Sequence, residues 1–351
     1  MMSSVSLCLC GRSKGIMSKT ILEVIDLKKH FFHRKGLFSF GEQQRSIPAV
    51  DGASFYLKEN ETVGLVGESG CGKTTIGRTI LRLEKPTSGR IIFDGTDITA
   101  LDTDELRKLR GKMQMIFQDL DAALNPRMRI REILREAIMV HHEVTDADVN
   151  KRIAELLEQV NLKKSKLSNF PHELSGGEKR RVGVARVLSV GAQFLVADEP
   201  TSALDVSIQA QVVNLLRDLQ KQLGLSYLFI SHDLRVVELM SHKVAVMYLG
   251  KIVEMGLSGR IANKASHPYT HILWSSLVEK QNREAGKKAT SVHAGRWGVF
   301  DFERPLEGCR FAPRCPVYES QGRPDICTNA ASEPALREIA GGHQVACHFP
   351  L

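Results

Sequence analysis

Residues 67–75 contain the residue types that bind nucleotide phosphates. Their sequence, GESGCGKTT, fits the pattern G-x-x-x-x-G-K followed by Ser or Thr. Glycines allow successive backbone N–H groups to turn toward one anion, and a helix that begins here directs its positive end at the phosphate. We expect Lys73 to reach the β- and γ-phosphates and Thr74 to hold Mg²⁺. The predicted nucleotide contacts in this P-loop are Gly67, Glu68, Ser69, Gly70, Cys71, Gly72, Lys73, Thr74 and Thr75.

Two carboxylates directly follow the apolar run at residues 194–197. If this run is a strand, Asp198 and Glu199 lie at the carboxyl edge of a sheet, where ligands bind in folds of this kind. Asp198 is suited to holding Mg²⁺ through water, and Glu199 to polarising the water that attacks a phosphate. Taken alone, an ordinary acidic pair at the end of a strand explains the pattern equally well.

A second glycine-containing helix start decides between these explanations. Ser175, Gly176, Gly177 and Glu178 open the helical stretch EKRRVGVARVL. A hydroxyl, exposed N–H groups and the helix dipole converge there on an anion. Two phosphate sites in one chain indicate that two chains share nucleotides. A flexible loop before a helix would not explain why this motif lies between the P-loop and the acidic strand.

Strands and helices alternate around these motifs. TVGLVG is a predicted strand ahead of the glycine loop, and TTIGRTILRL is the helix after it. AQFLVAD and YLFISHD are further buried strands, and KVAVMYLGKIVEMG is predicted to form a hairpin through residues 249–251. The alternation favours an α/β fold, with a P-loop NTPase core in which helices flank a parallel sheet.

Four segments are expected along the chain. Residues 1–20 are predicted to be a disordered extension, with Met17 an alternative start. Residues 21–262 form the main domain, whose first strands make an antiparallel β subdomain and into which a helical subdomain at about 119–190 is inserted. Thr145 or Asp146 is the expected N-cap of one of its helices. Residues 263–351 form a small, loop-rich, Cys-containing C-terminal domain, with a linker at about 280–300.

Composition excludes several protein classes. The 351 residues are 42% hydrophobic and 25% charged, which is ordinary for a folded domain and unlike a disordered or collagenous chain. We find no apolar run of the roughly 18 residues that a membrane span needs. The net charge of +8 would suit a nucleic-acid, anionic-lipid or acidic-ligand partner. A mildly basic solvated surface is the favoured explanation, because no block of five like charges occurs.

The motifs together resemble the ABC ATPase family over about residues 21–262. LSGGE resembles the family's signature motif, FLVADEP its acidic strand and SALD, at residues 202–205, its D-loop. Gln118 is similar to the Q-loop glutamine, His232 to the switch histidine, and Phe31 occupies the position of the aromatic residue that stacks on adenine. The resemblance implies ATP and Mg²⁺ as cofactors. It assigns catalysis to Glu199, His232 and Gln118, and Mg²⁺ binding to Thr74, Gln118 and Asp198. It also implies that residues 175–178 of an opposing subunit close on the γ-phosphate.

Nearly the whole chain resembles the oligopeptide and dipeptide permease ATPases. The motifs are AALNPR, VAVMYLGKIVEMG, SHPYTHILWSSL, GCRFAPRCP and VACHFP. This resemblance implies an ATPase that powers import of peptides or related small solutes, nickel included. The implied partners are two transmembrane permease subunits, a sister ATPase or a second copy, and, indirectly, an external solute-binding protein. The implied location is peripheral, on the cytoplasmic face of the bacterial inner membrane.

Two other functions share this ATP-binding pattern. ATPases that act on nucleic acid or ribosomes usually carry long coiled coils, zinc modules or two ATP-binding heads per chain. This sequence has one compact head and no heptads, so no nucleic-acid partner is expected. A module that senses ATP without hydrolysing it is disfavoured by Glu199 and His232, which are both intact.

Four of the seven cysteines lie close together near the C-terminus: Cys309, Cys315, Cys327 and Cys347. In a reducing compartment they imply no disulfide framework. Structural zinc usually brings a tight C-x₂₋₄-C pair, which these spacings lack. The permease resemblance implies a 4Fe–4S cluster held by all four thiolates. Buried thiols without metal are an equally good alternative.

Overall fold

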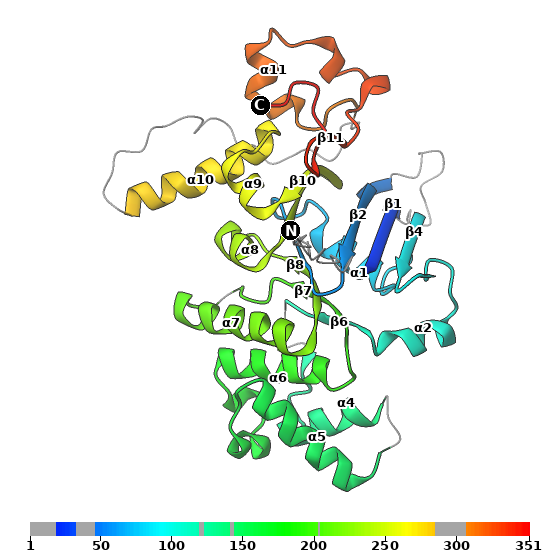
Figure 1. Cartoon of the computed structure of the whole chain (residues 1–351), viewed down its shortest axis with the longest axis vertical. Coiled ribbons are helices and arrows are strands. Elements are labelled where there is room, and N and C mark those ends of the chain that lie inside the picture. Colours follow the sequence, from blue (N-terminus) through cyan, green and yellow to red (C-terminus); the bar gives the residue numbers. More distant parts are fainter. Residues whose placement is uncertain (1–18, 33–45, 119–122, 141–143, 203, 285–306) are drawn as a thin grey trace, which may run out of the picture.

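The computed structural model describes residues 19–32, 46–118, 123–140, 144–202, 204–284 and 307–351. Within these ranges the strands form two sheets, with helices packed around them (Figure 1). Most of the predicted extension at 1–20 and of the predicted linker at 280–300 lies outside the described residues. The parts of these two segments that are described form regular secondary structure: a strand begins at Thr20, and a helix continues to Glu284.

The smaller sheet is antiparallel and has the strand order β2-β1-β4-β5 in the described part of the chain. It confirms the predicted antiparallel β subdomain. Alternate side chains of β1, among them Leu22 and Val24, are buried against Ile76 and Ile80 of the P-loop helix. The strands are β1 Thr20–Phe32, β2 Ser46–Lys58, β4 Ser88–Phe93 and β5 Thr96–Asp97.

The larger sheet has the order β11-β12-β10-β9-β3-β8-β7-β6 among the described strands. The run from β9 to β6 is parallel. Every residue of β3, β7 and β8 is buried, as expected for a parallel sheet covered on both faces. The strands are β3 Thr62–Val66, β6 Met113–Ile116, β7 Phe194–Asp198, β8 Ser226–Ile230, β9 Lys243–Tyr248, β10 Lys251–Leu257, β11 Arg337–Ala340 and β12 His343–Val345.

Helices cover the larger sheet, and α4, α5 and α6 lie together at the opposite end of the molecule from α11 (Figure 1). Thr145 caps α5, as predicted, and Gly224 ends α7 in a left-handed conformation at φ 67°. Neither α2 nor α8 was predicted from the sequence. The helices are α1 Lys73–Ile80, α2 Thr103–Arg110, α4 Ile130–Met139, α5 Asp146–Gln159, α6 Gly176–Leu188, α7 Val206–Leu223, α8 Leu234–Met240, α9 Ser258–Asn263, α10 Pro268–Glu284 and α11 Pro316–Ser320. No helix in the described ranges is long and apolar enough to span a membrane.

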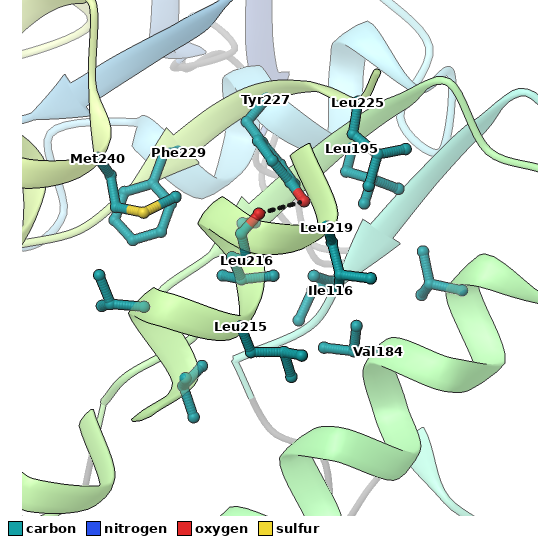
Figure 2. Close-up of a cluster of buried hydrophobic side chains, with 14 of the residues drawn as sticks. Ile116, Val184, Leu195, Leu215, Leu216, Leu219, Leu225, Tyr227, Phe229 and Met240 are labelled. Atoms are coloured by element: carbon teal, nitrogen blue, oxygen red, sulfur yellow. Dashed lines mark hydrogen bonds between the residues drawn. The ribbon is translucent and has the colours of Figure 1, made fainter. Parts of the chain in front are cut away.

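The apolar stripe of α7 packs on the parallel strands (Figure 2). Leu215, Leu216 and Leu219 are buried beside Tyr227, whose hydroxyl donates to the carbonyl of Leu216 at 3.1 Å. Leu223, the last residue of the helix, remains 42% exposed. This packing fixes the strands whose ends carry the predicted catalytic residues.

The C-terminal residues extend the larger sheet. Val345 in β12 pairs with Glu254 in β10, and β11 pairs with β12. The fully buried Glu254 carboxylate accepts hydrogen bonds from the N–H groups of Ser266 and His267, at 2.6 and 2.9 Å. Its Oε1 also lies 2.6 Å from Nε2 of the buried His343. One carboxylate therefore joins β10, the segment before α10 and β12.

We expect Glu254→Ala to lower the free energy of unfolding by about 3–5 kcal/mol, because it leaves His343 and two backbone N–H groups buried without an acceptor. Denaturant unfolding measures this loss. The control is Glu319→Ala, which removes an exposed carboxylate that pairs with Arg323 at 3.0 Å. That substitution should cost less than about 1 kcal/mol. Equal losses in the two variants would contradict the proposed role of Glu254.

Candidate nucleotide-binding and hydrolysis site

The P-loop connects β3 to α1 and requires glycine at its ends. At Gly72, φ is 109°, and an added Cβ would lie 2.0 Å from the backbone oxygen of Ala49. At Gly67, an added Cβ would lie 2.2 Å from the backbone oxygen of Met247. These close approaches seat the loop against β2 and the end of β9. The strand–loop–helix order predicted for a phosphate site is therefore confirmed.

Lys73 is the buried cation of the loop. Its Nζ donates to the backbone oxygens of Gly67 and Glu68, at 2.8 and 2.9 Å. Burial raises the pKa of the neighbouring Cys71 thiol, so this cysteine is neutral near pH 7 despite the adjacent ammonium. The loop thus presents one fixed positive charge and the N-terminal end of α1, a combination that suits an anion.

Two of the three predicted metal ligands, Thr74 and Asp198, lie together, whereas the third, Gln118, contacts Glu199. The Thr74 hydroxyl donates to Oδ1 of Asp198 at 3.1 Å. Burial raises the pKa of Asp198, and the hydrogen bond from Thr74 opposes that rise. A hydroxyl and a carboxylate are the hard oxygen ligands that Mg²⁺ prefers, and Mg²⁺ usually completes its shell with substrate phosphates. The residues present therefore fit Mg²⁺, which when bound neutralises charge on the β- and γ-phosphates.

The three predicted catalytic residues meet at Glu199. Gln118, just after β6, donates through Nε2 to one carboxylate oxygen at 3.2 Å, and Nδ1 of His232, just after β8, lies 3.2 Å from the other. Glu199 has φ 46°, a left-handed conformation that is strained for a residue with a side chain. Its N–H donates to the backbone oxygen of Ile230 at 2.9 Å. The structure thus brings together residues that are 81 positions apart in the case of Gln118 and Glu199.

The signature motif starts α6. Ser175 is the N-cap, and its Oγ accepts from the N–H of Glu178 at 3.3 Å. The Lys166 ammonium, 2.9 Å from Glu178, lowers the pKa of that carboxyl. Within the described residues, no hydrogen bond or ion pair joins residues 175–178 to the P-loop of the same chain. The predicted role of these residues, to close on the γ-phosphate of an opposing chain, stays a prediction.

Phe31 lies near the end of β1. Its ring is 40% exposed, and the Lys29 ammonium lies 4.8 Å from the ring centroid. The adjacent Phe32 is 54% exposed. Both rings are accessible for stacking, and the assignment of adenine to Phe31 stays a prediction.

The predicted iron–sulfur cluster is not supported. All four C-terminal cysteines are described, and no group of three or more His, Cys, Asp or Glu residues in the described chain is placed to hold a metal ion. Burial raises the pKa of Cys309 to about 11 and that of Cys347 to about 12, which favours neutral thiols. Because the placed residues do not fit a metal cluster, we assign no step of the function to one.

Two contacts of the P-loop were not predicted from the sequence. The Tyr269 hydroxyl accepts from the N–H of Glu68 at 3.0 Å, and Arg314 forms an ion pair with the Glu68 carboxylate at 2.8 Å. Both residues lie in motifs that carry the permease resemblance, SHPYTHILWSSL and GCRFAPRCP, but neither motif indicates a contact with the P-loop. Tyr269 and Arg314 are 201 and 246 positions away from Glu68 in the sequence, so their contacts with the loop become apparent only in the folded structure.

Comparison with known proteins identifies the family. Residues 50–202 match the family described as ABC transporter, and residues 253–321 match the family described as oligopeptide/dipeptide transporter, C-terminal region. The oligopeptide transport ATP-binding protein AppF of Bacillus subtilis (strain 168) is 46% identical over 332 residues, which cover 94% of this chain and 98% of AppF. This chain belongs to the ABC transporter family.

Other members of the family are similar to this chain in sequence or in structure. The oligopeptide transport ATP-binding protein OppF of Salmonella typhimurium is 43% identical, over 94% of this chain and 96% of OppF. The solved dimer of MJ0796, described as a bacterial ABC transporter cassette, is 27% identical, with a TM-score of 0.59, and covers 68% of this chain and 99% of that chain. CbiO1 from Clostridium perfringens is 26% identical, with a TM-score of 0.61, over 76% of this chain and 98% of that chain. The predicted α/β ATPase fold is confirmed.

We expect Glu199→Gln to retain ATP binding and to slow hydrolysis by about 10²–10⁴-fold, because a positioned general base typically contributes that much. Steady-state phosphate release and nucleotide binding measure the two effects separately. Glu238→Gln, which alters an exposed carboxylate on α8, is the control and should change neither. Hydrolysis within tenfold of wild type would exclude Glu199 as the base.

Proposed function

We propose that this ABC transporter chain binds and hydrolyses ATP and thereby powers the import of peptides or related small solutes across the cytoplasmic membrane. The observation that carries the proposal is the convergence on Glu199 of Gln118 and His232, each 3.2 Å away. The Thr74–Asp198 pair is at the same sheet edge. An oriented carboxylate beside an oxygen-rich metal site is the arrangement needed to attack a phosphate with water.

Each residue has a distinct task in this mechanism. Lys73 and the N–H groups of the P-loop bind the phosphates, and Thr74 and Asp198 hold the metal ion. Glu199 accepts the proton of the attacking water. Gln118 and His232 orient the Glu199 carboxylate through its two oxygens, so that the base is fixed before the water attacks.

The nucleotide is shared between two ATPase chains in this proposal. The site on one chain supplies the P-loop and Glu199, and residues 175–178 of the opposing chain close on the γ-phosphate. The opposing chain is a second copy or a sister ATPase. Support comes from the start of α6, which in the described part of the chain is not hydrogen-bonded to its own P-loop, and from the dimeric cassette of the similar protein MJ0796.

The solute and the partners are proposed from the family members. AppF and OppF are named as oligopeptide transport proteins, and residues 253–321 match the C-terminal region of such transporters. We therefore propose two transmembrane permease subunits as direct partners, an external solute-binding protein as an indirect one, and a peripheral position on the cytoplasmic face of the membrane. No comparison favours nucleic acid or ribosomes as the target.

The proposed domain organisation follows the predicted boundaries. Residues 21–262 form the ATP-binding domain, and the helical subdomain at about 119–190 contains α4, α5 and α6. Residues 263–351 form the peptide-permease-type C-terminal region. Its strands β11 and β12 add to β10, so the region shares the sheet of the ATP-binding domain.

In proteoliposomes that contain the permease subunits and the ATPase chains, we expect the peptide-loaded binding protein to stimulate ATP hydrolysis several-fold. The physical reason is that solute delivery at the permease favours closure of the two ATPase chains. Phosphate release with and without peptide measures the effect. Stimulation by nucleic acid, with none by any peptide, would contradict the proposed transport function.

Sharing of the nucleotide predicts complementation between two inactive variants. Lys73→Ala and Ser175→Arg should each reduce hydrolysis by at least about 100-fold, because each removes groups that bind the transferring phosphate. Mixing the two chains should restore activity, since a heterodimer contains one site with an intact P-loop and an intact signature. With a sister ATPase as partner, the two substitutions are divided between the sisters. A mixture no more active than either variant would contradict the shared site.

A further inference from the structure

Glu68, the second residue of the P-loop, is held from three sides. Its carboxylate oxygens accept from Nη1 and Nη2 of Arg314 at 3.0 and 2.8 Å. Its N–H donates to the Tyr269 hydroxyl at 3.0 Å, and its backbone oxygen accepts from Lys73 at 2.9 Å. Arg314 and Tyr269 belong to the C-terminal part of the chain, and Lys73 belongs to the P-loop itself. Glu68 therefore contacts Tyr269 and Arg314, which lie 201 and 246 positions further along the chain.

Arg314 is well placed to neutralise this carboxylate. It belongs to a short 3-10 turn, Ala312–Arg314, that immediately precedes Cys315, and its side chain is 17% exposed. A bidentate pair of an arginine with a carboxylate is among the stronger charge-assisted hydrogen bonds and fixes the geometry of both groups. The guanidinium also donates to the Tyr248 hydroxyl at 3.3 Å and lies 5.7 Å from the centre of that ring.

Aromatic packing fixes the position of the segment that carries Arg314 relative to the P-loop. The ring centroids of Tyr248 and Tyr269 are 4.6 Å apart, and Phe311 lies 5.3 Å from Tyr248 and 5.4 Å from Tyr269. All three side chains are buried. They come from β9, from α10 and from the segment just before Arg314. The cluster thus fixes the C-terminal segment against the strand that adjoins the P-loop.

The segment that carries Arg314 also supports the P-loop indirectly, through the turn between β9 and β10. Arg310 donates to the backbone oxygen of Leu249 and forms an ion pair with Asp51. Leu249 and Gly250 form the turn of the β9–β10 hairpin, and the N–H of Gly250 donates to the backbone oxygen of Cys71 at 2.9 Å. The C-terminal segment therefore supports both the beginning and the end of the P-loop.

We propose that Arg314 is a positioning residue for ATP binding, through which the C-terminal segment at 307–315 holds the P-loop in its phosphate-binding shape. The inference rests on the proposed function of the P-loop. Its physical basis is twofold. Loop N–H groups bind phosphate well only when they are held in place beforehand. In addition, a carboxylate on the loop repels a triphosphate unless a cation neutralises it.

The test is the dissociation constant of a fluorescent ATP analogue, measured by titration in variants of the full chain. We expect Arg314→Gln to weaken binding by about 5–50-fold, in the usual range for coupling between sites. Arg314→Lys keeps the charge without the bidentate geometry and should give a smaller loss. Arg323→Gln is the matched control, because it removes an exposed arginine of the same segment that pairs with Glu319. It should leave binding unchanged.

A second substitution separates positioning from general stability. In the double variant Glu68→Gln with Arg314→Gln, no unpaired carboxylate distorts the loop or repels the triphosphate, and Tyr269 and Lys73 still hold the backbone of residue 68. Binding should therefore recover to within a few-fold of wild type. A merely structural role of Arg314 predicts no such recovery. Arg314→Lys keeps the proposal testable should Arg314→Gln fail to fold.

Three outcomes are informative. Loss in Arg314→Gln with recovery in the double variant supports the proposal. Wild-type binding in Arg314→Gln, or a loss that Glu68→Gln does not relieve, overturns it. Failure of the wild-type chain to bind the analogue would overturn the proposed function itself, which keeps the two failures distinct.

Discussion

The parallel pairing of β3, β8 and β7 is the constraint on which the site depends. Ile230 pairs with Leu65 on one side and with Asp198 on the other, so the three strands end at nearly the same level. The P-loop, the acidic pair and His232 each follow one of these ends. A shift of register by one residue would move the hydrogen bonds around Glu199 out of reach. Burial of every residue in these strands, with α7 packed against them, prevents such a shift.

The C-terminal residues are integrated with this arrangement. They add two strands beyond β10, and the buried Glu254 fastens them there. From that position Arg314 and Tyr269 reach Glu68 in the P-loop. The C-terminal segment thereby contacts the P-loop, while the start of α6 is proposed to serve an opposing chain. The ATP site is thus assembled from three regions that are distant in sequence.

The sequence predicted those parts of the site that depend on local chemistry. The glycine pattern, the acidic strand end and the cap at Thr145 each have a local physical reason, and the structure places them before α1, at the end of β7 and at the start of α5, as predicted. The short helix α2 was missed because only Leu106 of its eight residues is buried, which leaves no apolar stripe to detect. Strand β11 was missed for a similar reason, since all four of its residues are exposed.

Long-range contacts could not be predicted in this way. Glu68 lies in the P-loop motif and Arg314 in GCRFAPRCP, but nothing in either motif indicates that the two side chains pair. The central claim, that two chains share each nucleotide, is tested most directly by the structure of the assembled transporter carrying Glu199→Gln and bound to ATP. The account predicts that the triphosphate lies between the P-loop of one ATPase chain and the signature motif, residues 175–178 or their counterpart, of the other. A triphosphate contacted by a single chain, with residues 175–178 facing solvent, would contradict it.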